Sequence, residues 1–355
     1  MAEKKRIAAI DLFCGIGGLT KGLELSGIDV VAGIDIDSTC EFTYTRNTKS
    51  RFVCRNVETL DVRELHNYYP SDTGIRVLVG CAPCQPFSRL SGKYRMDGYM
   101  DDKWKLLYSF SSIITKEKPD IVSMENVPDL EKNDVLHEFV NSLKQLDYNV
   151  SYGVVFCPDY GVPQNRRRLV LLASRLGEIR LIKPTRKKDD YMTVRDAIGC
   201  LTSIKAGESD TKDPMHRACA LSKKNLKRIQ QSKPGGTWKD WNSDLLLECH
   251  KKDSGKTYPS VYGRMEWDKP SPTITTQFFG YGNGRFGHPE QDRAISLREG
   301  AILQSFPLDY VFSDEKHPII LHDVATHIGN AVPVELGKAI GESILNHIKM
   351  TLGEA

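Results

Sequence analysis

The sequence contains no long hydrophobic run, and none of its apolar stretches approaches the ~20 residues that a membrane-spanning helix requires. Its basic amino terminus leads directly into a strand-like segment, without the apolar core of a signal peptide. A hydrophobic content of 40% and a charged content of 27% are ordinary for a soluble globular protein. We therefore expect no membrane contact, and the 355 residues suffice for one large domain and a smaller one.

Cysteine is sparse and lacks the spacing of a structural zinc site. The nine cysteines are scattered and odd in number, which is typical of reduced thiols in a cytosolic compartment. Only Cys81 and Cys84 form a C-x-x-C pair, so a four-cysteine zinc site is not expected. A redox-active or zinc-binding pair formed by these two residues stays open as an alternative.

The sequence also lacks a large excess of one charge sign, since its net charge is only +3. The charged residues are, however, unevenly distributed along the chain. Residues 185–260 hold 16 Lys and Arg against 10 Asp and Glu, whereas the remainder of the chain carries a net −3. A basic insert on a mildly acidic body suggests contact with a polyanion. A solvated charged surface without a partner is the plain alternative.

The first 35 residues alternate between strand and helix patterns. A buried strand is predicted over 6–13, a short helix follows and ends at Gly27, and a second strand covers 30–34. The glycine-rich turn after the first strand lacks the G-x-G-x-x-G spacing of a dinucleotide site. Glycine still lets a ligand approach the backbone, and Asp35 at the end of the second strand can hold a ribose diol. Glycine-rich turns also occur for tight packing alone.

Alternation of this kind continues through most of the chain and predicts an α/β fold with a doubly wound, mostly parallel sheet. Between residues 185 and 260 the regular alternation is lost, and it resumes near Leu297. The further predicted strands are 76–80, 119–124, 149–157 and 168–173, and the further predicted helices are 103–117, 134–146, 222–231 and 334–349.

Cys84 follows the apolar strand that contains Val77 and Val79, at the point where a strand ends and a loop begins. In an open α/β sheet, ligands and catalytic groups collect at that edge. Pro83 and Pro86 restrict the backbone on both sides of the thiol. Cys84 is therefore a candidate nucleophile, and a buried structural cysteine is the alternative.

Six segments, taken in order along the chain, resemble the DNA (cytosine-5) methyltransferases of the bacterial restriction–modification type. The resemblance implies the S-adenosylmethionine-dependent methyltransferase fold. It also implies a catalytic and cofactor-binding large domain, formed by residues 1–184 and 319–355. A smaller domain, 185–318, would hold the target-recognition region, with 185–260 as its most variable part. The segments are Asp11–Gly18, Pro83–Gln85, Glu125–Val127, Gln164–Arg168, Arg298–Pro307 and Gly329–Pro333.

The resemblance assigns the catalytic roles. Cys84 would add as a thiolate to cytosine C6, which makes C5 nucleophilic enough to accept a methyl group. Glu125 would hold a proton for cytosine N3 and bind the exocyclic amine, with a helix cap as its alternative role. Arg166 and Arg168 lie two apart, so on an extended segment both face one side, and they would hold the cytosine carbonyl oxygen. Arg167 would point away from them.

The implied cofactor is S-adenosyl-L-methionine, with S-adenosyl-L-homocysteine as product and no metal. Asp35 would bind the ribose hydroxyls, and Ile36 would face the adenine. Asn56 stands where the family usually has Asp, but its carbonyl oxygen can still accept a hydrogen bond. Lys103-Trp104 is a further departure from the family pattern, for which we have no functional reading. The other implied cofactor contacts are Phe13, Gly15, Gly17, Gly18, Val57, Pro83, Leu106, Asn330, Ala331 and Val332.

The implied partner is double-stranded DNA, bound by a bacterial, cytoplasmic monomer. A cognate restriction endonuclease would be a functional partner only, without physical contact. The loop 86–102 would close over a cytosine rotated out of the duplex. The basic stretch within 222–231 would contact phosphates. The residues expected to contact DNA are Ser88, Arg89, Lys93, Arg95, Lys223, Lys224, Lys227 and Arg228.

Three other functions are alternatives to DNA methylation. A branch of the family that methylates tRNA carries a Cys-Phe-Thr signature and a reduced recognition region, whereas this chain lacks the signature and keeps the basic insert. A non-catalytic nucleic-acid-binding module predicts loss of Cys84, Glu125 or the arginines, and all of them are present. A small-molecule methyltransferase would explain the glycine turn but not the segment Pro83–Gln85.

Overall fold

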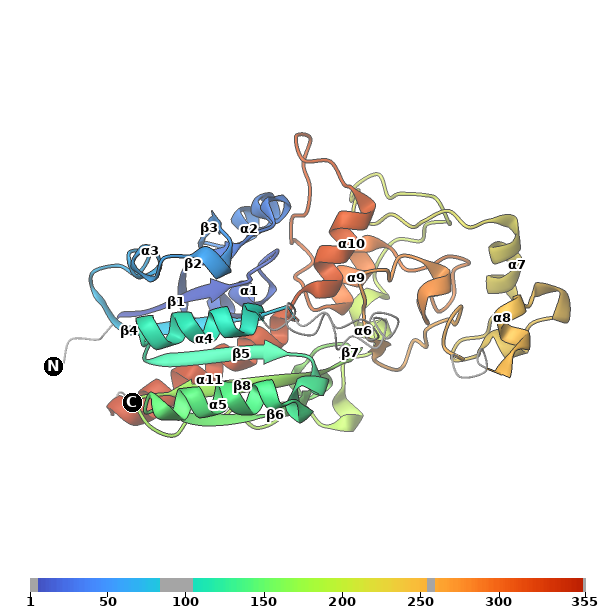
Figure 1. Cartoon of the computed structure of the whole chain (residues 1–355). Coiled ribbons are helices and arrows are strands. Elements are labelled where there is room, and N and C mark those ends of the chain that lie inside the picture. Colours follow the sequence, from blue (N-terminus) through green and yellow to red (C-terminus); the bar gives the residue numbers. More distant parts are fainter. Residues whose placement is uncertain (1–5, 84–104, 254–258, 354–355) are drawn as a thin grey trace. The chain divides into compact units, whose positions relative to one another are not determined.

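The computed structural model describes residues 6–83, 105–253 and 259–353, and it divides the chain into two compact units (Figure 1). Unit 1 consists of Met1–Tyr160, Arg167–Thr185 and Val332–Ala355. Unit 2 consists of Gly161–Arg166 and Arg186–Ala331. Within the described ranges, no helix combines the length and apolarity needed to cross a membrane.

Unit 1 is built on a seven-stranded sheet with the order β3-β2-β1-β4-β5-β8-β6. Neighbours from β3 to β5 are parallel, and β8 is antiparallel to both β5 and β6. The prediction of a doubly wound, mostly parallel sheet is therefore confirmed. The strands are β1 (Arg6–Leu12), β2 (Asp29–Asp35), β3 (Arg51–Cys54), β4 (Thr73–Gly80), β5 (Ile121–Asn126), β6 (Asn149–Phe156) and β8 (Arg167–Ser174).

Amphipathic helices cover the sheet, and Figure 1 shows α4 and α5 in front of it and α11 behind it. In α5, residues three and four apart are buried against the sheet, and the side chain of Asn133 caps the first turn by accepting from the N–H of Val135. Gly22 of α1 permits close contact with α11, because a Cβ there would lie 2.4 Å from the Val334 carbonyl oxygen. The helices are α1 (Gly18–Ser26), α2 (Glu41–Asn47), α3 (Val62–His66), α4 (Lys105–Glu117), α5 (Asp134–Gln145) and α11 (Val334–Leu352).

Unit 2 has little regular sheet, and aromatic side chains form one of its cores. Trp238, Trp241 and Tyr281 are buried there with Ile229 and Leu245. Its only strand pair in the described residues is β7 (Gln164–Asn165) with β9 (Ser271–Pro272). Its helices are α6 (Val194–Ile198), α7 (Lys223–Gln231), α8 (Glu248–Lys251), α9 (Leu297–Leu303) and α10 (Leu321–Asn330).

The unit boundaries differ from the sequence-based domain boundaries by one residue at Thr185 and by more at two other places. The predicted large domain resumes at residue 319, whereas unit 1 resumes at Val332 and α10 belongs to unit 2. Hydrogen bonds account for this placement, since the Gln304 amide donates to the carbonyl oxygens of Ile328 and Ala331. The short segment Gly161–Arg166 also belongs to unit 2. The division of labour between a catalytic and a target-recognition domain stays a prediction.

Candidate active site

The chain reverses its winding between β1 and β4, and several polar residues meet at the carboxyl edge of these strands. The register pairs Leu12 with Gly80 and Gly80 with Met124. The glycine turn after β1, the segment after β4 and the end of β5 therefore lie beside one another. Open α/β sheets bind their ligands at such a switch point.

Glu125 is the buried carboxyl of this edge, with 2% of its surface exposed. Its Oε2 accepts a hydrogen bond from the Cys81 thiol at 2.8 Å. Its Oε1 lies 2.9 Å from Nε of Arg168 in an ion pair. That pair lacks hydrogen-bond geometry, and Oε1 has no hydrogen-bond partner among the described residues. A buried acceptor left open in this way is suited to a ligand.

Glu125 does not cap a helix, so that alternative is wrong. The sequence places it just after a strand that ends at Met124, whereas β5 continues to Asn126 because Glu125 and Asn126 pair with Val170 and Leu169 of β8. The short helical turn that follows has Val127 at its N-cap and no side-chain cap. The Glu125 side chain instead faces Cys81 and Arg168.

Asn126 and Cys81 belong to this edge, although no site role is predicted for Asn126 and the only role predicted for Cys81 is as a partner of Cys84. The Asn126 amide donates to the Ala82 carbonyl oxygen at 3.1 Å. Its own carbonyl oxygen accepts from the N–H of Val127 at 2.8 Å. The amide thus ties the segment after β4 to the end of β5. The motif Glu125–Val127 was the available signal for Asn126, since it lies within that motif.

Several predicted residues lie at or beyond the edge of the described ranges. Pro83 is exposed at the last described position before a gap. The predicted nucleophile and the loop contacts to DNA lie outside the described residues, namely Cys84, Ser88, Arg89, Lys93 and Arg95. The departure at Lys103-Trp104 lies outside them too.

The two arginines predicted to act together have separate surroundings. Arg168 lies in β8 and pairs with Glu125, with 14% of its side chain exposed. Arg166 is 3% exposed and donates to Gln164 Oε1 and to the carbonyl oxygens of Ile274 and Gly329, all within unit 2. Arg166 lies between β7 and β8, whereas Arg168 lies within β8, and their joint contact with the cytosine carbonyl oxygen stays a prediction. Arg167 is exposed, as predicted.

The glycine turn after β1 has an unusual backbone and an open face. Phe13, Gly15 and Gly17 all have positive φ, at 60°, 50° and 87°. Such a conformation is costly for Phe13 and typical of functional sites. A Cβ on Gly15 would have no atom within 4 Å, so the turn leaves space for a ligand. Gly18, which follows, is buried at the start of α1.

Asp35 at the end of β2 faces this turn. Its two carboxylate oxygens accept hydrogen bonds from the N–H groups of Gly15, at 2.8 Å, and Asp37, at 2.9 Å. These bonds fix the carboxylate beside the glycine turn. The adjacent Ile36 is 66% exposed, which is unusual for a large apolar side chain and leaves it available to a flat ligand.

Asp11, beneath the same turn, is a second buried carboxyl. It is 1% exposed, and its Oδ2 accepts from the Thr20 hydroxyl at 2.7 Å. Burial raises the pKa of Asp11 to about 7, although the hydrogen bond from Thr20 lowers it. Asp11 therefore holds a proton through much of the acidic pH range.

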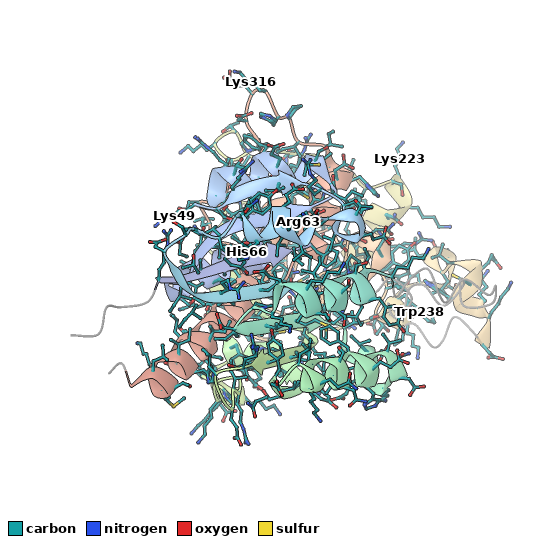
Figure 2. The ribbon with its side chains drawn as sticks, turned by 60° about the vertical axis from the view of Figure 1, so that its left-hand side comes forward. Lys49, Arg63, His66, Lys223, Trp238 and Lys316 are labelled. Atoms are coloured by element: carbon teal, nitrogen blue, oxygen red, sulfur yellow. The ribbon has the colours of Figure 1, made fainter. Side chains whose placement is uncertain are left out.

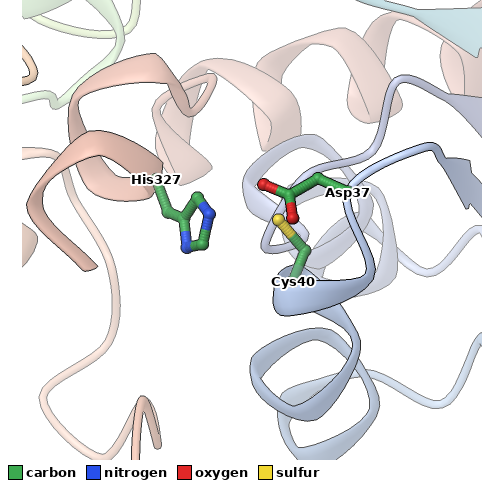
Figure 3. A group of neighbouring side chains, drawn as sticks. All are labelled: Asp37, Cys40 and His327. Carbon is green, nitrogen blue, oxygen red and sulfur yellow. The ribbon is translucent and has the colours of Figure 1, made fainter. Parts of the chain in front are cut away.

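Two of the neighbouring cysteines are protected from ionisation. Burial, the main cause, raises the pKa of the Cys14 and Cys40 thiols, and the negative charge of Asp35 adds to it. Cys40 also lies beside Asp37, which raises its pKa further (Figure 3). His327, drawn in the same figure, comes from α10 of unit 2. Thiols held protonated in this way are poor nucleophiles.

The remaining predicted cofactor residues differ in how accessible they are. Asn56 is half-buried, but its carbonyl oxygen already accepts from the N–H of Glu58 at 2.9 Å. Val57 and Val332 are buried, and Leu106 is half-buried. Asn330 is exposed and Ala331 half-buried at the end of α10 in unit 2.

Comparison with known proteins decides the family. A model of the family described as C-5 cytosine-specific DNA methylase matches residues 7–346. The chain belongs to this family. It is a DNA (cytosine-5) methyltransferase, and such an enzyme uses S-adenosylmethionine and acts on DNA.

Relatives of this methylase match over nearly the whole chain. It is 54% identical over 340 residues to the Type II methylase M.HgiDII of Herpetosiphon aurantiacus, covering 95% of this chain and 94% of that protein. It is 31% identical over 341 residues to the Type II methyltransferase M1.HphI of Haemophilus parahaemolyticus, covering 95% and 86%.

Solved structures share the fold of this methylase. A prophage-encoded methyltransferase of E. coli superimposes with a TM-score of 0.73 at 22% identity, covering 97% of this chain and 99% of that chain. The S. pombe Dnmt2 methyltransferase gives a TM-score of 0.63 at 17% identity, covering 98% and 99%.

Helix α7 carries the basic residues that the sequence assigns to DNA contact, and the structure separates them into two kinds. Lys223, Lys224 and Lys227 are exposed, and Figure 2 shows Lys223 standing clear of its ribbon. Arg228 is only 4% exposed and donates to the Leu245 carbonyl oxygen and Asn225 Oδ1. Its guanidinium also lies 5.5 Å from the ring centroids of Trp241 and Tyr262.

The assignment of Arg228 to DNA contact is therefore corrected. A cation enclosed by two aromatic rings and a carbonyl oxygen stabilises the core of unit 2 and has little surface left for a phosphate. The helical spacing of the four basic residues could not reveal this, because Trp241 and Tyr262 come from later segments. The three lysines stay as predicted phosphate contacts.

We expect the triple variant Lys223→Gln, Lys224→Gln and Lys227→Gln to bind DNA more weakly at low salt and to fold normally. The slope of log K against log salt should fall by about 1 for each lysine that contacts a phosphate. Titration of labelled DNA at several salt concentrations measures this slope. An unchanged slope would mean that the lysines form only a solvated face.

Arg228→Gln is the matched comparison on the same helix. It should lower the free energy of unfolding by about 2–4 kcal/mol, from lost charged hydrogen bonds and two cation–π contacts. Denaturant unfolding measures that loss. Its salt slope for DNA binding should equal that of the wild type under conditions where it is folded.

Proposed function

We propose that this methylase transfers a methyl group to C5 of cytosine within a short, specific sequence of double-stranded DNA. It would act as the modification enzyme of a restriction–modification system or as a solitary methylase. The observation that carries the proposal is the buried Glu125, whose Oε1 is open to a ligand. Its Oε2 accepts a hydrogen bond from Cys81, and Arg168 forms an ion pair with the carboxylate. The relatives named Type II methylases support the restriction–modification setting.

Cys84, Glu125 and Arg168 would divide the chemistry. The Cys84 thiolate would add to C6 of cytosine, and the displaced electron pair would move into the ring while Glu125 gives its proton to N3. C5 would then bond to the methyl carbon as the bond from that carbon to the sulfonium sulfur breaks, which leaves S-adenosylhomocysteine. Water would take the C5 proton as the Cys84 thiolate departs from C6, and N3 would return its proton to Glu125. Arg168 lies close enough to Glu125 to face the cytosine carbonyl oxygen.

S-adenosylmethionine would supply the methyl group. The carboxyl edge fits this cofactor, because the open face of Gly15, the fixed carboxylate of Asp35 and the exposed Ile36 lie beside one another. Asp35 would hold the ribose hydroxyls and Ile36 the adenine. Asn56 would offer its second lone pair, because the first is used by Glu58. The remaining proposed contacts are Phe13, Gly17, Gly18, Val57, Pro83, Leu106 and Val332.

The burial of Glu125 supports the proposal that the base leaves the duplex. A carboxyl with 2% exposure at the bottom of a strand edge cannot reach N3 of a cytosine that is stacked and paired. Rotation of the nucleotide out of the helix costs a few kcal/mol and is the usual solution for enzymes that act on a base. We propose that this methylase binds as a monomer and flips its target cytosine.

The test is methyl transfer by the purified chain from radiolabelled S-adenosylmethionine to double-stranded DNA, with tRNA as competing substrate. We expect label in DNA, and bisulfite sequencing of DNA from cells expressing the chain should show methylated cytosine within one short sequence. Label in tRNA alone would support a tRNA methyltransferase instead. Methylation at many unrelated sequences would contradict a specific recognition region.

A further inference from the structure

The structure gives Cys81 a role beyond its place three residues before Cys84. It follows β4 directly, and its Sγ lies 2.8 Å from Oε2 of Glu125. We propose that Cys81 is a positioning residue for methyl transfer, whose thiol holds Oε2 so that the proton of Glu125 sits on Oε1. This inference rests on the proposed role of Glu125 as the group that protonates cytosine N3.

The two oxygens of Glu125 have different surroundings, and this difference sets where the proton lies. A carboxylic acid carries its hydrogen on one oxygen and accepts with the other. The thiol donates to Oε2, which makes Oε2 the accepting oxygen. Oε1 has the Arg168 guanidinium 2.9 Å away as an ion-pair neighbour but no hydrogen-bond partner in the described chain, so it is the oxygen left to exchange a proton with a base.

The thiol also acts after the proton has left. When Oε1 gives its proton to N3, the carboxylate becomes negative, and the Cys81 thiol and the guanidinium of Arg168 from β8 stabilise that charge. Hydrogen bonds to a charged acceptor are stronger than those to a neutral one. The proton returns from N3 to Oε1 when Cys84 leaves the ring, so the cycle consumes no proton at this site.

Backbone contacts hold the thiol in place, which distinguishes it from a cysteine that meets the carboxyl by accident. The N–H of Cys81 donates to the Leu12 carbonyl oxygen at 3.4 Å. The next residue, Ala82, is 1% exposed, and its carbonyl oxygen accepts from the Asn126 amide. The neighbouring strands β1 and β5 therefore fix the segment from which the thiol projects.

The experiment compares Cys81→Ala, Cys81→Ser and the control Cys157→Ala, which removes a buried thiol elsewhere in unit 1. Cys81→Ala should lower kcat about tenfold or more, because it removes a hydrogen bond to a charged group. Its KM for DNA and for S-adenosylmethionine should change by no more than about twofold, since the loss is confined to the chemical step.

Rescue by serine separates positioning from mere packing. The proposed role needs a hydrogen-bond donor beside Oε2, and Cys81→Ala lacks one. Cys81→Ser keeps a donor at the same place and should restore kcat. Cys157→Ala should leave kcat unchanged.

The inference is overturned if Cys81→Ala has wild-type kcat, if Cys81→Ser fails to restore kcat, or if the defect of Cys81→Ala is confined to KM and melting temperature. Absence of DNA methylation by the wild type would instead refute the proposed function. If Cys81→Ala does not fold, Cys81→Val, which is apolar and of similar volume, takes its place with the same expected result.

Discussion

Replacement of Cys84 by serine is expected to abolish methyl transfer to DNA while leaving the fold and cofactor binding intact. A hydroxyl is a far weaker nucleophile than a thiolate at neutral pH, so the addition to cytosine C6 that activates C5 would be lost. We expect the rate to fall roughly a thousandfold or more, as for other enzymes that lose their nucleophile. Transfer of radiolabel from S-adenosylmethionine to DNA measures the rate.

Two controls make this result specific. Cys54→Ser changes an exposed cysteine and should leave the rate unchanged. DNA with 5-fluorocytosine at the target should form a complex with the wild type that survives denaturant, because fluorine cannot leave C5 as a proton does. Cys81 is the alternative candidate for the nucleophile, since its thiol contacts Glu125. A cross-link mapped to Cys81, or substantial turnover by Cys84→Ser, would contradict the assignment of the nucleophile.

Glu125→Gln is expected to have the second largest effect, a fall in kcat of about a hundredfold or more, in the range of a lost general acid. The glutamine amide keeps the shape of the side chain but cannot give a proton to N3. Single-turnover methylation with saturating DNA and cofactor measures the chemical step directly. Retention of kcat would exclude Glu125 as the proton donor.

Glu117 offers a matched buried carboxyl that has no part in the proposed chemistry. Its side chain is 3% exposed and pairs with Arg76 and His66 at the end of α4. Glu117→Gln should lower the melting temperature because the cation of Arg76 loses its partner. Its methylation rate, measured below that temperature, should match the wild type. A similar loss of rate in both variants would point to stability and not to chemistry.

Much of the fold could be predicted because its elements have regular patterns. The first strand, predicted over 6–13, is Arg6–Leu12, and the last helix, predicted over 334–349, is Val334–Leu352. Each has an apolar face or run of the right period, which depends only on neighbouring residues. Glu125 could also be found, because it lies in the segment Glu125–Val127, which resembles a motif of the family.

The sequence could not reveal contacts between residues far apart in the chain. The bond from Cys81 to Glu125 joins the ends of two strands 44 residues apart. Arg228 lies on the same helix as the exposed lysines, and its spacing from them does not distinguish it. The rings of Trp241 and Tyr262 nevertheless enclose its guanidinium. Arg166 and Arg168 fall into different units because a two-residue strand, β7, pairs with β9 and ends the extended segment.

Asp11 makes the stability of the folded chain depend on proton uptake. Its pKa is about 7 in the folded state, against 3.8 for an ordinary aspartate. Between these two pH values the folded chain binds a proton that the unfolded chain has already released. By linkage, this carboxyl favours the folded state fully below pH 3.8, and its contribution declines as the pH rises to about 7. The carboxyl beneath the glycine turn therefore stabilises the folded chain at acidic pH, and this contribution to stability has been lost once the pH rises above about 7.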